Sequence, residues 1–158
     1  MQCSVARALE VVGDWWSLLI VRDALFGVTR FEEFQRRLGI ARNTLTDRLD
    51  WLVDHGVLER VPYQESPLRH DYRLTAKGRD LRRVLTAVRE WGDEWVTPPG
   101  GPPLVATDGG GDPVELRLVN ARTGEPVPDD RLRMVPGPGA TDPRTIPPRL
   151  AGAVRPAP

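Results

Sequence analysis

The sequence has very few of the residues on which several classes of protein depend. Cys3 is the only cysteine, so no disulfide can form within the chain, and two histidines give no metal-ligand spacing and no nucleophile–base pair. No apolar run approaches the roughly 20 residues that span a membrane, and no basic stretch with an apolar core opens the chain as in a signal peptide. We therefore expect a cytoplasmic protein without metal or cofactor, and we do not expect an enzyme.

Aromatic residues are absent from the C-terminal part of the chain. All ten lie at or before Trp95, whereas 14 of the 16 prolines and nine of the 15 glycines follow it. Residues 1–97 therefore hold the material of a core. Residues 98–113 are predicted to be a Pro/Gly-rich linker, residues 114–135 a small β-hairpin and residues 136–158 a disordered tail.

An excess of one charge is also absent. The 22 basic residues balance the 22 acidic ones, and the balance holds on each side of Thr97. The net charge therefore gives no reason to expect binding to nucleic acid. An argument for such binding depends on where individual arginines lie. Lys77 is the only lysine, and guanidinium groups suit phosphate and guanine.

Apolar spacing and turn residues predict four helices, a hairpin and a last helix. The predicted helices cover residues 5–12, 15–26, 29–39, 42–55 and 76–95, and the strands cover residues 57–63 and 70–75. Asp14 and Thr75 can cap the second and last helices, and Thr29 with Glu32 matches a T-x-x-E capping box. The alternation from Val114 to Val119 predicts one more strand. This order is that of a winged helix-turn-helix, a mainly α fold with a small β wing whose second helix enters the DNA major groove.

The helix over residues 42–55 has an outward face suited to base recognition. Leu45, Leu49, Leu52 and Val53 share its buried side, and its first two turns present Arg42, Asn43, Thr44, Thr46 and Asp47 outward. Such side chains can contact guanine or phosphate, adenine, the thymine methyl group and cytosine. An ordinary solvated face is the alternative, and Asp50 and Asp54 would repel phosphates from the far end of the helix.

Five further basic residues are candidates for DNA contact. Arg48 either reaches a phosphate or pairs with an acidic residue such as Asp14. Arg30 stands beside free backbone N–H groups at the start of the third helix, which suit a phosphate. The remaining three lie at or near the hairpin tip, where a wing meets the adjacent groove or backbone: Arg69, His70 and Arg73.

Three segments match one family in order and spacing. They read CSVARALEVVGDWWSLLIVRDALFG, TRFEEFQRRLGIARNTLTDRLDWLVDHGVLERV and YRLTAKGRDL. Over residues 3–95 the chain resembles the HxlR-type winged-helix transcription regulators, relatives of the MarR group. The resemblance implies a homodimer whose first and last helices pack together, with two recognition helices in successive major grooves of a near-palindromic operator.

An apolar stripe on the last helix favours a dimer independently, because one small domain cannot easily cover it. The predicted dimer interface comprises Val5, Leu9, Leu81, Val84, Leu85, Val88, Trp91 and Trp95.

The sequence departs from the family pattern in three places. Some members sense oxidants through a cysteine near the N-terminus; Cys3 occupies that place, although Ser4 replaces the usual proline and a small buried residue is the alternative. Ala41 and Arg42 replace the usual Ser-Pro at the start of the recognition helix. The tail resembles an extension that carries zinc ligands in some members, but no thiolate remains here, which predicts a metal-free hairpin.

These patterns predict a sequence-specific DNA-binding transcriptional regulator, acting as a homodimeric repressor that responds to an unknown small-molecule effector or to oxidation. A winged-helix protein-interaction module without DNA binding is the alternative, and the zero net charge permits it. Salt dependence separates the two, because binding to DNA releases counterions.

Overall fold

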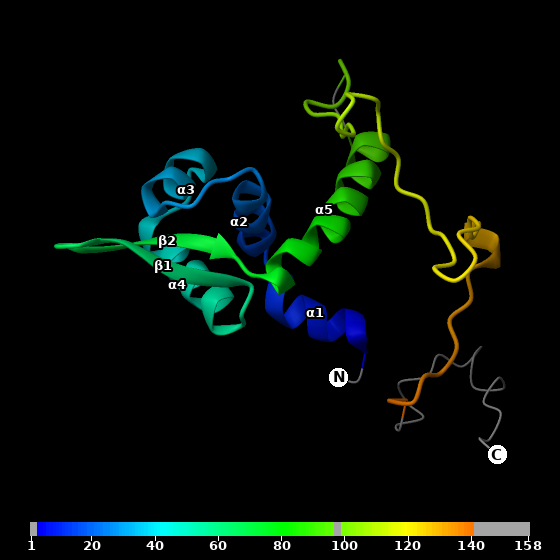
Figure 1. The fold of residues 1–158 in the computed structure, drawn as a ribbon, viewed down its shortest axis with the longest axis horizontal. Helices are drawn as coiled ribbons and strands as arrows, with labels where there is room; N and C mark the ends of the chain where they lie inside the picture. The colour runs from blue at the N-terminus through cyan, green and yellow to red at the C-terminus, as the bar shows by residue number, and fades with distance from the viewer. Residues whose placement is uncertain (1–2, 97–98, 141–158) are drawn as a thin grey trace. The chain divides into compact units, whose positions relative to one another are not determined.

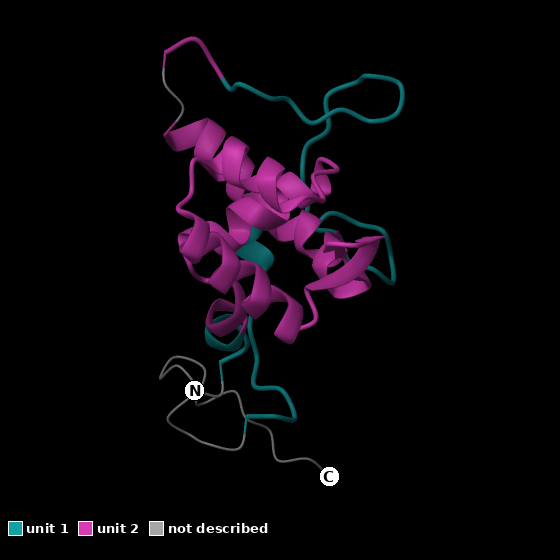
Figure 2. Cartoon of the chain, turned by 90° about the vertical axis from the view of Figure 1, so that its left-hand side faces the viewer, with its two compact units in different colours: residues 1–7, 102–158 teal, residues 8–101 magenta. Residues whose placement is uncertain are grey.

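The computed structural model describes residues 3–96 and 99–140. It divides the chain into two compact units, one of residues 8–101 and one of residues 1–7 with 102–158 (Figure 2). The predicted boundaries of the linker, the extension and the tail stay predictions.

Five helices and one hairpin follow in the predicted order (Figure 1). They are α1 (Ser4–Val12), α2 (Trp15–Leu25), α3 (Phe31–Leu38), α4 (Arg42–Asp54), β1 (Leu58–Glu65), β2 (Leu68–Leu74) and α5 (Ala76–Trp95). The predicted fold class, mainly helical with a two-stranded wing, is confirmed.

Two of the three predicted helix caps are present. The Asp14 carboxylate accepts hydrogen bonds from the backbone N–H groups of Trp16 and Ser17 at 3.0 and 3.1 Å, and the Thr75 hydroxyl accepts one from Gly78. The capping box at Thr29 is wrong. The α3 helix starts at Phe31, after Arg30, and the Thr29 hydroxyl donates to Asp71 at 3.2 Å instead.

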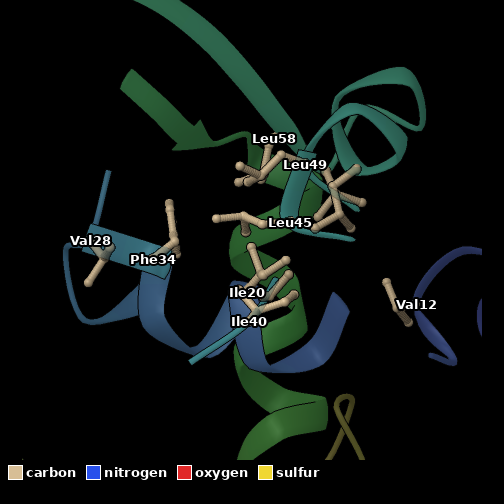
Figure 3. Close-up of a cluster of buried hydrophobic side chains, with 11 residues drawn as sticks. Val12, Ile20, Val28, Phe34, Ile40, Leu45, Leu49 and Leu58 are labelled. Carbon is tan, nitrogen blue, oxygen red and sulfur yellow. The ribbon is translucent and has the colours of Figure 1, made fainter. Parts of the chain in front are cut away.

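The core lies where α2, α3, α4 and the base of the hairpin meet. Phe34, Leu45, Leu49 and Leu52 are fully buried, and Leu45 lies in the middle of the labelled side chains in Figure 3. Full burial of such a side chain contributes about 1.5–3 kcal/mol. The leucine face that the periodicity of α4 predicts is therefore the face that packs.

A three-residue connection sets α4 against α3. Gly39 ends α3 with a φ of 63°, a left-handed conformation that glycine adopts without steric cost. Ile40 turns into the core, with 3% of its surface exposed. The predicted tight turn between the two helices is confirmed.

The hairpin is longer than predicted and its turn is shorter. Antiparallel pairing runs from Leu58 opposite Leu74 to Glu65 opposite Leu68, so only Ser66 and Pro67 separate the strands. Consequently Arg69 lies in a strand next to the tip, opposite Gln64.

Arg73, which was predicted at or near the tip of the hairpin, lies at its base. Arg73 lies opposite Glu59, one pair from the end of the ladder. Its placement near the tip is therefore wrong, because the strands continue through most of the predicted loop.

The strand predicted from Val114 to Val119 does not form. Residues 102–140 form no continuous strand; they have two isolated bridges, Thr107 with Pro113 and Val119 with Pro126, and one short 3-10 helix, Asp129–Arg131. The turn after Val119 is present, because the Asn120 carbonyl accepts from the N–H groups of Thr123 and Gly124. No residue from 102 to 140 is buried, so no core supports a ladder there. The predicted disorder falls largely on residues 141–158, which lie outside the described residues.

A buried carboxylate joins α2 to α3. Asp23 is fully buried, and its two oxygens accept from Arg22 Nε at 3.0 Å and from Arg37 Nε at 3.1 Å. Both arginine side chains remain partly exposed. The carboxylate therefore depends on these two donors, since water cannot replace them.

Replacing Arg37 by alanine should lower the free energy of unfolding by about 1–3 kcal/mol, because one buried Asp23 oxygen loses its donor. Urea denaturation followed by tryptophan fluorescence, at one protein concentration, measures the change. Arg36→Ala is the matched control: this exposed neighbour makes no side-chain hydrogen bond or ion pair with the described residues, so it should stay within about 0.5 kcal/mol of wild type. Equal effects of the two substitutions would contradict the role given to Asp23.

Candidate nucleic-acid interface

The first two turns of α4 present the polar surface that the helical periodicity predicts. Arg42, Asn43, Thr46 and Asp47 are exposed and Thr44 is half-buried, while Leu45 faces the core. Ala41 precedes the helix without a side-chain cap. The outward direction of this face is confirmed, and its contact with base edges stays a prediction.

Two side chains of this face make contacts of their own. The Thr46 hydroxyl donates to the backbone carbonyl of Arg42 at 3.0 Å, which leaves its methyl group and an acceptor lone pair for a partner. The guanidinium carbon of Arg42 lies 4.9 Å from the centroid of the Phe31 ring on α3. Arg42 makes no side-chain hydrogen bond or ion pair within residues 3–96 and 99–140.

Of the two roles predicted for Arg48, the structure shows the pairing with the acidic residue Asp14. Its Nε lies 3.4 Å from Oδ1 of Asp14, the residue that caps α2. The contact is an ion pair without the alignment of a hydrogen bond. Arg48 thus ties the middle of α4 to the start of α2, and its contact with a phosphate stays a prediction for its remaining N–H groups.

The far end of α4 is also held by charge. Asp50 forms an ion pair and a hydrogen bond with Arg60 on β1, a residue that the sequence did not single out. Partial burial lowers the pKa of Arg60, but Asp50 and Tyr72 raise it by more in sum, so its pKa lies above its ordinary value and the guanidinium stays charged. Asp50 therefore presents less free negative charge to a duplex than the sequence suggests, whereas Asp54 is exposed.

Asp71 on β2 collects three partners. It is 9% exposed, and it accepts from Thr29 Oγ1 at 3.2 Å and from Arg73 Nη2 at 3.1 Å, with Arg30 Nε at 3.9 Å. Backbone pairing of Arg30 with Asp71 adds the segment before α3 to the edge of the hairpin. Arg30 and Arg73 are thus brought together at the base of the wing, with more than half of each side chain exposed.

The tip of the wing carries fewer of the predicted residues. The Arg69 side chain is exposed and has no hydrogen bond or ion pair within the part of the chain that the structure describes, and His70 is half-buried opposite Pro62. Tyr63 of β1 lies beneath Arg30, with 4.7 Å between the guanidinium carbon and the ring centroid. The sequence did not indicate that Phe31 and Tyr63 lie against these two arginines, because no local pattern signals which arginine a ring will meet.

The predicted dimer interface is mostly exposed in the single chain. Val84, Val88, Trp91 and Trp95 of α5 have 46–69% of their surface exposed. Val5 and Leu9 of α1 are exposed as well, whereas Leu81 and Leu85 pack partly against the core.

Three further features of the described residues concern redox sensing, metal binding and membrane insertion. Cys3 is exposed, so the alternative of a small buried residue does not hold in the single chain. Among the described residues, no three His, Cys, Asp or Glu side chains converge in a way that could hold a metal ion. None of the described helices is long and apolar enough to cross a membrane.

The chain is similar to known transcriptional regulators. A model of the HxlR-like helix-turn-helix family matches residues 11–99. The uncharacterized HTH-type transcriptional regulator Rv3095 of Mycobacterium tuberculosis is 46% identical over 137 residues, which cover 86% of this chain and 87% of that protein.

Solved structures extend the similarity to the fold. PA1607 is 47% identical with a TM-score of 0.73, and the match covers 84% of this chain and 93% of that one. The transcriptional regulator YodB of B. subtilis, in its reduced form, is 30% identical with a TM-score of 0.53, covering 62% of this chain and 98% of its own. The match to PA1607 therefore covers a larger share of this chain than the match to YodB.

Replacing Asp71 by asparagine should lower the free energy of unfolding by about 1–3 kcal/mol, because Thr29, Arg30 and Arg73 lose the charge that they share. Chemical denaturation at constant protein concentration measures this. Asp54→Asn removes an exposed carboxylate without a partner among the described residues and should change the free energy by less than about 0.5 kcal/mol. An Asp71 variant as stable as wild type would show that the cluster does not anchor the wing.

Proposed function

The chain belongs to the HxlR-like helix-turn-helix family, whose members are DNA-binding transcriptional regulators, and on that basis we propose that it is a homodimeric repressor of a near-palindromic operator. One observation supports this most directly. The outward N-terminal turns of α4 carry Arg42 and Asn43, beside a hairpin that exposes Arg69. Occupation of the operator would block the promoter sterically.

In this proposal α4 lies in the major groove and the hairpin meets the neighbouring backbone. Arg42 contacts guanine or phosphate, and Asn43 contacts adenine. Thr44 and Thr46 offer methyl groups to thymine, and Asp47 accepts from cytosine N4. Phosphate contacts come from Arg69 and His70 in the wing and from the free N–H groups of three arginines that also serve the fold: Arg30, Arg48 and Arg73.

The dimer is supported by the apolar surface on α1 and α5. Val84, Val88, Trp91 and Trp95 would expose a continuous apolar stripe if the chain stayed a monomer. A twofold axis through this stripe covers it in both copies at once. Two α4 helices related by that axis fit half-sites about one helical turn, or roughly 34 Å, apart.

The regulator acts in the cytoplasm, without a catalytic activity of its own. Its signal is a small-molecule effector or oxidation of Cys3, whose thiol is exposed. The extension after residue 97 serves as a metal-free appendage of the DNA-binding domain.

The wild-type protein should select defined sequences from genomic DNA fragments at moderate salt, with an affinity that falls steeply as salt rises. Arg42→Ala and Arg69→Ala should each weaken binding of the selected duplex by about 1–3 kcal/mol, and loss of a phosphate contact should reduce the salt slope by about one. Fluorescence anisotropy over a salt series measures both quantities. Arg83→Ala, an exposed arginine of α5, is the control. Unchanged affinity and slope in both variants would favour a protein-interaction module.

Replacing Trp91 by glutamate should yield monomers. Trp91 is 62% exposed in the single chain, so the carboxylate of the new glutamate would be buried only if the dimer formed through this surface. Sedimentation velocity at equal concentrations measures the oligomeric state, and affinity for the selected duplex should fall with it. Arg83→Glu, at another exposed position of α5, should leave a dimer. A dimeric Trp91 variant would contradict the assignment of the α5 stripe.

A further inference from the structure

Two arginines of the candidate interface lie over aromatic rings. The guanidinium carbon of Arg42 is 4.9 Å from the Phe31 ring centroid, and that of Arg30 is 4.7 Å from the Tyr63 ring centroid. Both distances are within the range of cation–π attraction. The two pairs are not equivalent, however, because their arginines differ in their other contacts.

Arg30 has a carboxylate besides its ring. Asp71 lies 3.9 Å from its Nε, and the backbone of Arg30 pairs with that of Asp71. Glu32 and Glu33 follow in the first turn of α3, where acidic side chains satisfy the positive end of the helix. Several contacts therefore hold Arg30 in place, and it does not depend on its ring alone.

Arg42 depends on its ring alone. It has no ion pair and no side-chain hydrogen bond within the described residues, and its backbone stands at the first position of α4. An exposed arginine samples many rotamers, and ordering it on DNA costs conformational entropy. An aromatic ring at this distance restricts the guanidinium by cation–π attraction, and it does not pair the five N–H donors with acceptor atoms.

We propose that Phe31 is a positioning residue for DNA recognition, which holds the guanidinium of Arg42 ready for a guanine edge at the start of the recognition helix. The inference rests on the proposed DNA binding and goes beyond it, since it makes a residue of α3 a determinant of sequence preference. The contact also ties the first residue of α4, which has no side-chain cap before it, to the preceding helix.

The test is a double-mutant cycle on the duplex that the wild-type protein selects most strongly, labelled with fluorescein. Phe31→Leu keeps an apolar side chain but removes the ring, and it should weaken binding about two- to fivefold. Arg42→Gln should weaken binding by more, at least about fivefold. In the Arg42→Gln background the Phe31→Leu substitution should have no further effect, because the ring then has no guanidinium to hold.

Two further variants separate positioning from packing. Phe31→Tyr keeps the ring face and should bind as wild type does. Tyr63→Leu removes the ring under Arg30, which Asp71 also holds, and should cost less than about twofold. Because Phe31 is half-buried against the core, urea denaturation of each variant accompanies the binding measurements. Should Phe31→Leu fail to fold, Phe31→Met takes its place in the cycle.

A repeat of the selection with Phe31→Leu should show relaxed preference at the same base position as with Arg42→Gln. Binding by Phe31→Leu at wild-type affinity would overturn the inference and leave the proposed function intact. An equal loss from Phe31→Leu with and without Arg42 would also overturn it, since the ring would then act through packing. If the wild-type protein selects no sequence, the proposed function fails and the inference fails with it.

Discussion

The carboxylate of Asp71 is the contact on which the arrangement of the wing depends. A nearly buried carboxylate must receive hydrogen bonds or ion pairs, and here they come from Thr29, Arg30 and Arg73. The need for these donors draws the segment before α3 against the edge of the hairpin. It also decides that the Thr29 hydroxyl does not cap α3, and that two arginines gather at the base of the wing.

The zero net charge of the chain conceals an uneven distribution of paired and unpaired charges. Asp14 takes Arg48, Asp23 takes two arginines, and Asp50 takes Arg60, so many charges cancel inside the fold. Three of these pairs also join elements, because Asp14–Arg48 and Asp50–Arg60 hold α4 and Asp23–Arg37 holds α3. Arg42 and Arg69 are left exposed, without a carboxylate partner among the described residues. Local pairing of charges, rather than their sum, therefore decides which arginines stay exposed on this surface.

The extension illustrates why an alternating pattern alone does not make a strand. Val114, Leu116 and Leu118 alternate with Glu115 and Arg117, and the latter two form an ion pair with each other. A strand needs a partner for its backbone and a core for its apolar face. In the described part of this unit the apolar side chains stay exposed and the backbone forms isolated bridges, so no continuous ladder builds up.

The order of the elements, the leucine face of α4, the caps at Asp14 and Thr75 and the turn at Gly39 could all be predicted from the sequence. They depend on interactions within about one helical turn, which periodicity and capping patterns record directly. The choice between partners far apart in the sequence was decided only by the tertiary structure. Thr29 binds Asp71 across 42 residues, Arg48 takes Asp14, and Arg42 lies over Phe31 of a different helix. A local pattern cannot specify such pairs, because it carries no information about which distant segments the packing of the core brings together.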